Sequence, residues 1–478
     1  MPNAPLRVLL VNSNRMQPPV APIALDYLGS ALERQSIGFE VLDLCFSQDM
    51  EADVARALEG RELGLVAVTF RNTDDVYYAS QDFFLPRLRE VTDLLRKHTA
   101  APIVLGGAGF SIMPEAVLDY CGLDLGIWGE GEIALPLLAR RLCAGEEVAD
   151  VPGLVHRRGK RLARVPASYV ALKDLPMPQR SAVDNPRYFR EGAMVGVETQ
   201  RGCPMRCIYC ADPLGKGRSR RLRSAQSVAE EVVALVEQGI DHIHFCDAEF
   251  NMPEAHSRAV ATALIERGLG RKVRWYAYAS PAPLLDELAR LWRESGCAGI
   301  DFGVDSGNEA MLRSLGRHFG VEEVVHTAEV CHRQGLTFMF DLLLGGPGET
   351  WDSVRETVEL MKRLEPDRVG VSLGVRVFPG TGLADFVLGE GPLEANPNVR
   401  GALTPDFVAP AFYLASALGD DAASHLRELV GGDPRFFTPS TRDTQDYNYN
   451  RNQVLVDAIR QGHRGAFWDI LRRKAQGR

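Results

Sequence analysis

The segment Arg201–Pro213 contains three cysteines, Cys203, Cys207 and Cys210, and constrains this chain more than any other feature. Their C-x3-C-x2-C spacing puts three thiolates on one short loop, and thiolates are the usual ligands of iron in iron–sulfur clusters. A four-iron cluster with three protein ligands keeps one iron open to a small molecule. Two alternatives remain. A zinc site needs four ligands, and no second Cys or His pair lies nearby; free cysteines are also often simply buried. We predict the cluster.

The bulk properties limit the class of protein. A chain of 478 residues is too long for one ordinary core, so we expect two or three domains. The net charge of −9 argues against a general nucleic-acid binder. No apolar run reaches the length of a membrane span, and the N-terminal residues lack a signal-peptide pattern. Nine cysteines spread over the chain predict no disulfide framework. We therefore expect a cytoplasmic protein with no nucleic-acid or membrane partner.

Residues 1–145 alternate short apolar runs with amphipathic stretches. This βα order predicts a doubly wound parallel sheet, an α/β domain of the Rossmann-like type, whose ligand lies at the carboxyl ends of the strands. The expected strands are Arg7–Asn12, Phe39–Leu44, Leu63–Phe70, Pro102–Gly107 and Asp124–Trp128, and the expected helices are Pro22–Gln35, Glu51–Leu58 and Phe83–His98.

Small and polar residues follow four of these strands. Glycines there allow a ligand to approach the backbone closely, although glycines are common at strand ends in any case. The residues concerned are Asn12 and Ser13, Arg71 and Asn72, Gly106, Gly107, Gly109 and Ser111, and Gly129 and Glu130.

Residues 146–190 are rich in proline and are predicted to form a linker, after which the βα alternation resumes over 191–384. Six βα units predict a partial TIM barrel with its active site at the carboxyl ends of the strands. The expected strands are Ala193–Thr199, His242–Phe250, Val273–Ser280, Gly299–Ser306, Leu336–Gly345 and Arg368–Phe378; the helices include Ala225–Glu237, Glu254–Arg267, Leu284–Glu294 and Trp351–Leu364. The cluster loop follows the first of these strands.

Residues 385–478 are expected to form a small helical cap over the open end of the barrel. Its helices are predicted at Gln453–Arg460 and Arg464–Lys474. The run Asp446–Asn452 alternates Tyr with Asn, and it either faces a small organic substrate or docks the cap as a polar loop. Arg376 either binds substrate or pairs with a carboxylate, and we expect the pair.

The whole pattern resembles the cobalamin-dependent radical S-adenosylmethionine (SAM) enzymes of the methyltransferase type. The resemblance rests on C-x3-C-x2-C, on V-L-G-G-A-G-F-S and W-G-E-G-E within residues 1–145, and on Leu-Pro-Met-Pro at 175–178. It implies three cofactors: a 4Fe-4S cluster, SAM and cobalamin. It further implies a small-molecule substrate and an external one-electron reductant of the flavodoxin or ferredoxin type. The cofactors would carry the hard chemistry, and the protein would supply ligation and orientation.

The resemblance also implies roles for particular residues. Cys203, Cys207 and Cys210 would hold the cluster and carry the radical step. Tyr209 would pack on the adenine of SAM, Asp247 and Glu249 would lie near its amino group, Asp305 and Ser306 near its ribose or carboxylate, and Gly345 and Gly346 would leave it room. Gly106, Gly107, Gly109 and Ser111 would line the channel for the cobalamin tail, with Arg71 and Asn72 near the lower corrin face. For Asp247 and Asp305 a helix-capping role is an open alternative, and Glu249 could also face the cluster.

One feature departs from the better-known cobalamin methyltransferases. They carry a cobalt-ligating His after the first strand, whereas here that loop reads Asn-Ser-Asn-Arg-Met-Gln-Pro-Pro. A cationic Arg71 cannot coordinate cobalt. The hypothesis is a base-off cobalamin without a histidine ligand. Nitrogen superhyperfine splitting from a lower ligand in the EPR spectrum of the cob(II)alamin form would contradict it.

The implied function is transfer of a methyl group from SAM, via methylcobalamin, to a non-nucleophilic carbon of a secondary-metabolite intermediate. A cyclisation or rearrangement on the same scaffold, without methyl transfer, is the first alternative, and a non-catalytic cofactor-binding protein is the second. Methylthio transfer is disfavoured because Cys45, Cys121 and Cys143 are too scattered to hold a second cluster. The remaining cysteines, Cys246, Cys297 and Cys331, are expected to be small buried hydrophobes.

Overall fold

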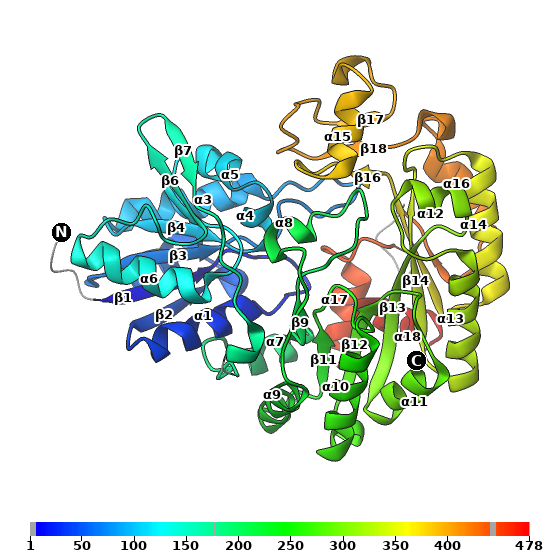
Figure 1. The fold of residues 1–478 in the computed structure, drawn as a ribbon, viewed down its shortest axis with the longest axis horizontal. Coiled ribbons are helices and arrows are strands. Elements are labelled where there is room, and N and C mark those ends of the chain that lie inside the picture. The colour runs from blue at the N-terminus through cyan, green and yellow to red at the C-terminus, as the bar shows by residue number, and fades with distance from the viewer. Residues whose placement is uncertain (1–5, 176, 440–445, 478) are drawn as a thin grey trace.

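A computed structural model describes residues 6–175, 177–439 and 446–477. Two sheet-based units lie side by side, the N-terminal one in blue and cyan and the larger one in green and yellow (Figure 1). Between them run α8 (Asp212–Lys216), β9 (Gln200–Arg201) and β16 (Val375–Arg376).

The N-terminal sheet has seven strands in the order β2-β1-β3-β4-β5-β6-β7, of which β1 to β5 are parallel. Its first strand is apolar and almost fully buried, as expected for a strand covered on both faces. The strands are β1 Arg7–Asn12, β2 Gly38–Asp43, β3 Leu65–Thr69, β4 Ile103–Gly106, β5 Leu125–Ile127, β6 Leu154–Arg158 and β7 Arg161–Arg164.

Helices cover both faces of this sheet. α1 (Ile23–Arg34) and α6 (Gly131–Ala144) contribute to one hydrophobic core, and α2 (Met50–Leu58), α3 (Leu85–His98) and α5 (Pro114–Cys121) contribute to the other. The short α4 (Ala108–Ile112) follows β4. The predicted doubly wound α/β fold is confirmed.

The segment predicted as a linker is only partly one. β6 and β7 lie within residues 146–190 and extend the first sheet as an antiparallel hairpin beyond β5. Both strands are short and rich in arginine, so they lack the apolar run by which a strand is recognised. The rest of the segment, including α7 (Asn185–Arg190), leads into the barrel.

The second sheet is a partial barrel of parallel strands in the order β8-β11-β12-β13-β14-β15-β19. Six strands were predicted; the seventh, β19, has only two residues and comes from the C-terminal segment. The strands are β8 Val195–Val197, β11 His242–Phe245, β12 Arg274–Ala279, β13 Cys297–Asp305, β14 Phe338–Leu344, β15 Arg368–Leu373 and β19 Phe436–Phe437.

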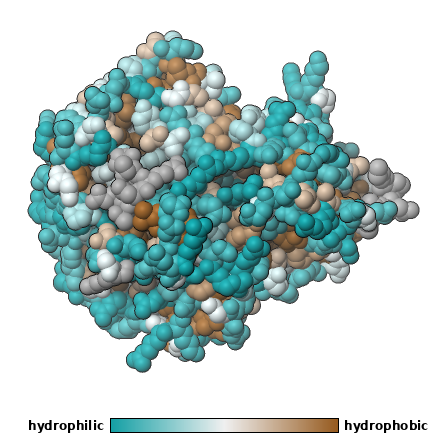
Figure 2. Space-filling view, turned by 180° about the vertical axis from the view of Figure 1, so that it is seen from behind, coloured by the Kyte–Doolittle hydropathy of each residue, from teal (hydrophilic) through white to brown (hydrophobic). Residues whose placement is uncertain are grey.

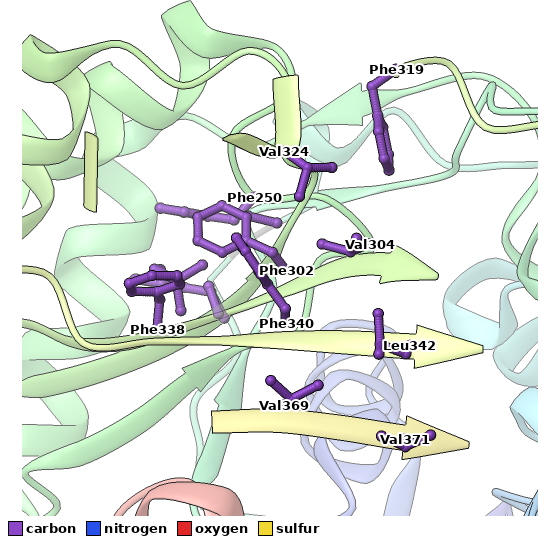
Figure 3. Close-up of a cluster of buried hydrophobic side chains, with 14 of the residues drawn as sticks. Phe250, Phe302, Val304, Phe319, Val324, Phe338, Phe340, Leu342, Val369 and Val371 are labelled. Atoms are coloured by element: carbon purple, nitrogen blue, oxygen red, sulfur yellow. The ribbon is translucent and has the colours of Figure 1, made fainter. Parts of the chain in front are cut away.

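Alternate residues of these strands face opposite ways. Phe302, Phe340 and Val371 belong to the large core between the strands and the outer helices (Figure 3). Their neighbours in sequence point into the barrel lumen. The outer helices are α9 Ala225–Glu237, α10 Glu254–Glu266, α11 Asp286–Glu294, α12 Glu309–Ser314, α13 Val321–Gln334 and α14 Trp351–Leu364.

The C-terminal ninety residues differ from the predicted helical cap. β16, β17 (Val399–Gly401) and β18 (Ala411–Tyr413) form a small sheet, with α15 (Gly382–Gly389) and α16 (Ala422–Val430) nearby. α17 (Gln453–Arg460) and α18 (Phe467–Ala475) pack with the lumen residues Tyr276 and Met339. The last two helices therefore fill the lumen from its amino-terminal side and leave the carboxyl end to the site.

Buried ion pairs join the two units. Arg180, from the connecting segment, lies 3.5 Å from Asp26 of α1 and 3.4 Å from Glu231 of α9. Arg376 of β16 donates to Asp74, 2.9 Å away, which follows β3. Both partners of this last pair are at most 1% exposed, so the predicted pairing of Arg376 is confirmed.

Hydrophilic residues cover most of the face seen in Figure 2, and hydrophobic residues are scattered there in small groups. Among the helices of the described residues, none is long and apolar enough to cross a membrane.

Candidate active site between the two units

The cluster loop follows β8 and β9 and is anchored by its backbone. Cys203 N donates to Gly217 O, Cys210 N donates to Cys207 O, and Ile208 N donates to Leu315 O. Cys203 is buried and the other two cysteines are half-buried. Burial raises the pKa of all three thiols, that of Cys210 to about 12. Iron that binds here would displace three protons, as metal ions do from thiols.

The three thiols belong to one short loop, but they are not close enough together to bind one metal ion. The charge of Cys207 raises the pKa of both Cys203 and Cys210, and that of Cys203 raises the pKa of Cys210 as well. In the described parts of the chain no three side chains of the His, Cys, Asp and Glu types gather tightly enough to hold a single metal ion. A zinc site would require four such ligands at one point. The cluster loop offers three thiols, one ligand fewer than a structural zinc site requires.

Arg317, between α12 and α13, connects the cluster loop to the barrel and was not predicted. It donates to Cys207 Sγ (3.1 Å) and to Tyr209 Oη (3.2 Å), and it lies 3.4 Å from Asp305. Glu249 is 4.0 Å away. A single arginine in the loop Gly-Arg-His-Phe carries no sequence signal, and only the fold reveals its position.

Arg317 yields the first prediction. Replacing it with alanine removes the donor to Cys207 Sγ and the counter-charge of Asp305, so we expect kcat/KM of the catalysed reaction to fall by about 10–100-fold. Arg317→Lys should restore little, because lysine lacks the planar fork that reaches several acceptors. Arg313→Ala, one helical turn earlier and 72% exposed, is the control and should behave as wild type. The measurements are the steady-state rate and the iron content of each variant. An Arg317→Ala protein with the wild-type rate would contradict a role for Arg317 in supporting the cluster loop.

The predicted carboxylates at the end of β11 have different surroundings. Asp247 accepts from the backbone N–H of Thr199 (2.8 Å) and of Gln200 (3.2 Å), and so braces the turn that leads to the cluster loop. Burial raises its pKa to about 6. Burial also raises the pKa of Glu249, to about 7, and the charge of Glu249 in turn raises the thiol pKa of Cys203. Glu249 lies 4.0 Å from Arg317, which contacts Cys207, so its carboxylate is near the cluster loop.

Asp305 is the last residue of β13, and Ser306 follows it. Asp305 adopts a left-handed conformation (φ 65°) and accepts a 2.5 Å hydrogen bond from Tyr209, which is thereby held beside the cluster loop. Ser306 is fully buried and shares a hydrogen bond with Thr357 of α14, so its hydroxyl is engaged within the fold.

Gly345 and Gly346 follow β14. Gly345 has a φ of 95°, and its N–H donates to Glu349. A side chain at either position would collide with Leu414 or Leu315, respectively, so both glycines allow close packing at the mouth of the barrel. Glu349 is 1% exposed and also accepts from Ser353.

Glu349 yields a pH prediction. Burial raises its pKa from 4.5 to about 7, so the folded protein binds this proton more tightly than the unfolded chain does. Stability therefore falls as pH rises from about 4.5 and levels off above about 7. Between these pH values the wild-type protein loses free energy of unfolding, and Glu349→Gln should lose up to about 3 kcal/mol less. Urea unfolding at about pH 5 and about pH 8 measures it. The exposed Glu359→Gln on α14 should keep the wild-type pH dependence, and an equal dependence in Glu349→Gln would contradict the assignment.

A cavity opens at the carboxyl ends of β3, β4 and β5. Five glycines line it, together with Ser111, Glu130 and, from the barrel unit, Lys216. The glycines are Gly106, Gly107, Gly129, Gly131 and Gly215. Because they carry no side chains, the backbone itself forms the wall, which suits the close approach of a nucleotide-like group. Glu130 is held by Arg221 and by Val170 N–H.

Other predicted residues of the first unit lie elsewhere. Asn12 is fully buried and its amide donates to Asp43 and Tyr188, 2.9 Å from each. Gly109 packs against the backbone of Asn72, where a Cβ would lie 3.0 Å away. These two residues shape the strand ends from within. Ser13, Arg71 and Asn72 line a second, more polar cavity.

Arg71 reaches across to the barrel. Its charge affects the pKa of His244 on β11, of Cys246 just after β11, and of Tyr278 on β12. His244 is kept neutral, with a pKa of about 4, by burial and by Arg71. Tyr278 is 48% exposed although it lies in a central strand, so the lumen is open to solvent at this level. Of the cysteines expected to be buried, Cys331 is, whereas Cys246 and Cys297 are half-buried.

The comparisons with known proteins agree with this geometry. Residues 197–361 match the Radical SAM superfamily, and residues 11–139 match the B12 binding domain. The fold and the site thus define a cobalamin-binding radical SAM enzyme, which uses a 4Fe-4S cluster, SAM and cobalamin.

Two relatives extend over the whole chain. Tryptophan 2-C-methyltransferase of Streptomyces laurentii is 34% identical, with 96% of this chain and 95% of the relative covered. The structure of the radical SAM methyltransferase TsrM from Kitasatospora setae, with tryptophan substrate and the SAM analog aza-SAM bound, has a TM-score of 0.92 at 30% identity. It covers 98% of this chain and 99% of TsrM. The chain belongs to the cobalamin-dependent radical SAM methyltransferases, and it transfers a methyl group from SAM via cobalamin to carbon.

A second TsrM structure, with cobalamin and the 4Fe-4S cluster bound, has a TM-score of 0.90 at 29% identity and covers 99% of this chain. OxsB with aqua-cobalamin and SAM bound shares the fold at 18% identity, with a TM-score of 0.71.

Proposed function

We propose that this chain methylates C2 of the indole ring of tryptophan or of a close tryptophan analogue. The observation that carries the proposal is the 34% identity to tryptophan 2-C-methyltransferase over 96% of the chain. The tryptophan-bound relative shares the fold over both units and the C-terminal segment. The half-open lumen, with aromatic Tyr278 beside the mouth, supports a flat aromatic substrate of this size.

The site residues of this proposal divide into two groups. Cys203, Cys207 and Cys210 hold the cluster, while Glu249 and Asp305 lie toward the open iron and SAM. The glycine-walled cavity with Ser111 takes the cobalamin tail, and Arg71 and Asn72 lie near the lower corrin face without a histidine ligand. Bound cobalamin supplies a methyl carrier; the protein's own residues orient it and the substrate.

The proposal includes an external one-electron reductant of the flavodoxin or ferredoxin type, because a cluster of this kind must be reduced to act. It also places the protein in the cytoplasm, where thiol ligands stay reduced. The substrate is a small molecule, and neither a nucleic acid nor a membrane takes part.

The test is an anaerobic reaction of the reconstituted holoenzyme with tryptophan and SAM that carries a trideuterated methyl group. We expect one labelled methyl group per product, with the indole C2 proton absent from the NMR spectrum. Methylation at the ring nitrogen or at another carbon, or no labelled product, would contradict the proposal. Because the indole ring is electron-rich, 5′-deoxyadenosine in the same samples measures how far hydrogen abstraction contributes.

A further inference from the structure

The lumen contains a pair of carboxylates that the site described above does not use. Asp301 of β13 and Asp341 of β14 lie on the lumen faces of adjacent strands, where Asp341 pairs in register with Gly303, two residues beyond Asp301. Asp301 is 5% exposed, and Asp341 is half-buried at the edge of the open space. The two side chains are hydrogen-bonded to each other.

The pair lacks a counter-cation. Asp247 and Glu349 lack one too, but both accept hydrogen bonds from backbone N–H groups. Asp26, Asp74 and Glu231 each have an arginine within 4.0 Å. Within the described ranges neither Asp301 nor Asp341 has such a partner. Burial raises the pKa of both carboxyls, and the charge of Asp341 raises that of Asp301 further. A cationic group that bound beside the pair would stabilise its charged form.

Two tyrosines of the C-terminal segment complete the cluster. Tyr447 is hydrogen-bonded to Asp341, and Tyr449 lies close enough for the charges of both carboxylates to raise its pKa. Asp301 Oδ1, Asp341 Oδ1 and Tyr449 Oη are buried without a hydrogen-bond partner. Buried oxygens of this kind are costly unless something donates to them.

The Tyr/Asn run docks the C-terminal segment on the N-terminal unit, which is one of the two roles considered for it. Asn448 donates to Asp75 and Ser80, and Asn450 donates to Asp82, so the asparagines dock the segment on the N-terminal unit. The tyrosines between them face the carboxylate pair. The neighbouring strand makes room as well: a Cβ on Gly370 would lie 2.1 Å from Asp341 Oδ1 and 2.4 Å from the Tyr447 ring.

The chemistry of the cluster selects its ligand. A divalent metal ion would need further ligands, and no third His, Cys, Asp or Glu joins the pair within the described residues. A primary ammonium group has one positive charge and three donors. Two carboxylates and a hydroxyl provide the charge and the acceptors for it. Tyr278 is near the pair as well, since the charges of both carboxylates raise its pKa while that of Arg71 lowers it.

We propose that Asp301 and Asp341 bind the α-ammonium group of the amino-acid substrate and so select tryptophan over indoles that lack the amine. This inference rests on the proposed function and deepens it by assigning the amine subsite. Asp341 and Asp301 are positioning residues: they hold the substrate by its amine while the indole ring reaches toward the cofactors.

The experiment compares tryptophan with indole-3-propionic acid, which lacks only the amine. Wild-type holoenzyme should prefer tryptophan. Asp341→Asn should raise KM for tryptophan by at least about tenfold, because a charged hydrogen bond is lost. Its kcat/KM for indole-3-propionic acid should stay within about twofold of wild type. Asp301→Asn should also lower the preference for tryptophan over indole-3-propionic acid. Asp367→Asn, just before the start of β15, is the control and should leave this preference unchanged.

The outcomes separate the two proposals. An Asp341→Asn enzyme that loses activity on both compounds equally, or that keeps its wild-type KM for tryptophan, overturns the ammonium site. If wild type methylates neither compound, the proposed function itself fails and the amine subsite fails with it. Folding is monitored by thermal unfolding without substrate. Asparagine keeps the shape and the hydrogen-bonding capacity of the aspartate and removes a buried charge, so Asp341→Asn should melt no lower than wild type.

Discussion

Cys207→Ala should abolish methyl transfer and sharply lower the iron content of the reconstituted protein. With two ligands left, the loop can no longer hold a cluster that keeps one iron open for SAM, and Cys207 is also the cysteine that Arg317 contacts. We expect product to fall to the limit of detection in an anaerobic assay with strong reductant, with the fold retained by circular dichroism.

Cys297→Ala provides the matched control, since Cys297 is half-buried at the start of β13 and lies outside the ligand loop. Its iron content and rate should equal those of wild type. A Cys207→Ala protein that keeps both full iron content and measurable product would show that Cys207 is not a cluster ligand.

Breaking the Arg376–Asp74 pair should have the largest effect on stability. Both side chains are buried, and Arg376 also donates to Phe407 O, 3.2 Å away. Arg376→Ala leaves Asp74 as an uncompensated buried charge at the interface between the two units, which costs about 3–5 kcal/mol. Chemical denaturation of the cofactor-free protein, followed by tryptophan fluorescence, measures the loss.

Two further variants test the cause. Asp74→Asn combined with Arg376→Met removes both charges and should recover much of the stability, because neither charge is then left unpaired. Arg290→Ala breaks an exposed pair with Glu294 and should change stability little. If Arg376→Ala unfolds at the wild-type denaturant concentration, the pair does not hold the two units together.

The sequence predicted the elements whose side chains alternate clearly. The strand predicted at Arg7–Asn12 has those bounds in the structure, and the helix predicted at Trp351–Leu364 is α14. Two patterns were enough to predict such elements: a short apolar run for a strand and an amphipathic repeat for a helix. Both patterns arise directly from which side chains are buried. β7 and β19 were missed because strands of four and two residues are too short for any period to show.

The site was only partly visible in the sequence. The cluster cysteines have a fixed spacing and were found at once, whereas Arg317 acts through a loop far from them in sequence. Asn12 was predicted to contact a ligand because it ends a strand. Its amide instead donates hydrogen bonds to Asp43 and Tyr188 within the fold. Asp341 stands inside the apolar strand Phe338–Leu344, where the sequence gives no sign that its side chain faces a lumen.

The most direct test of the account is a pair of anaerobic reactions with tryptophan, SAM and reductant, one with hydroxocobalamin supplied during reconstitution and one without. Mass spectrometry would follow S-adenosylhomocysteine and methylated tryptophan. We predict that both appear in equal amounts and only when cobalamin is present. Methylated product in the cobalamin-free reaction, or tryptophan converted without S-adenosylhomocysteine, would contradict methyl transfer through cobalamin in this protein.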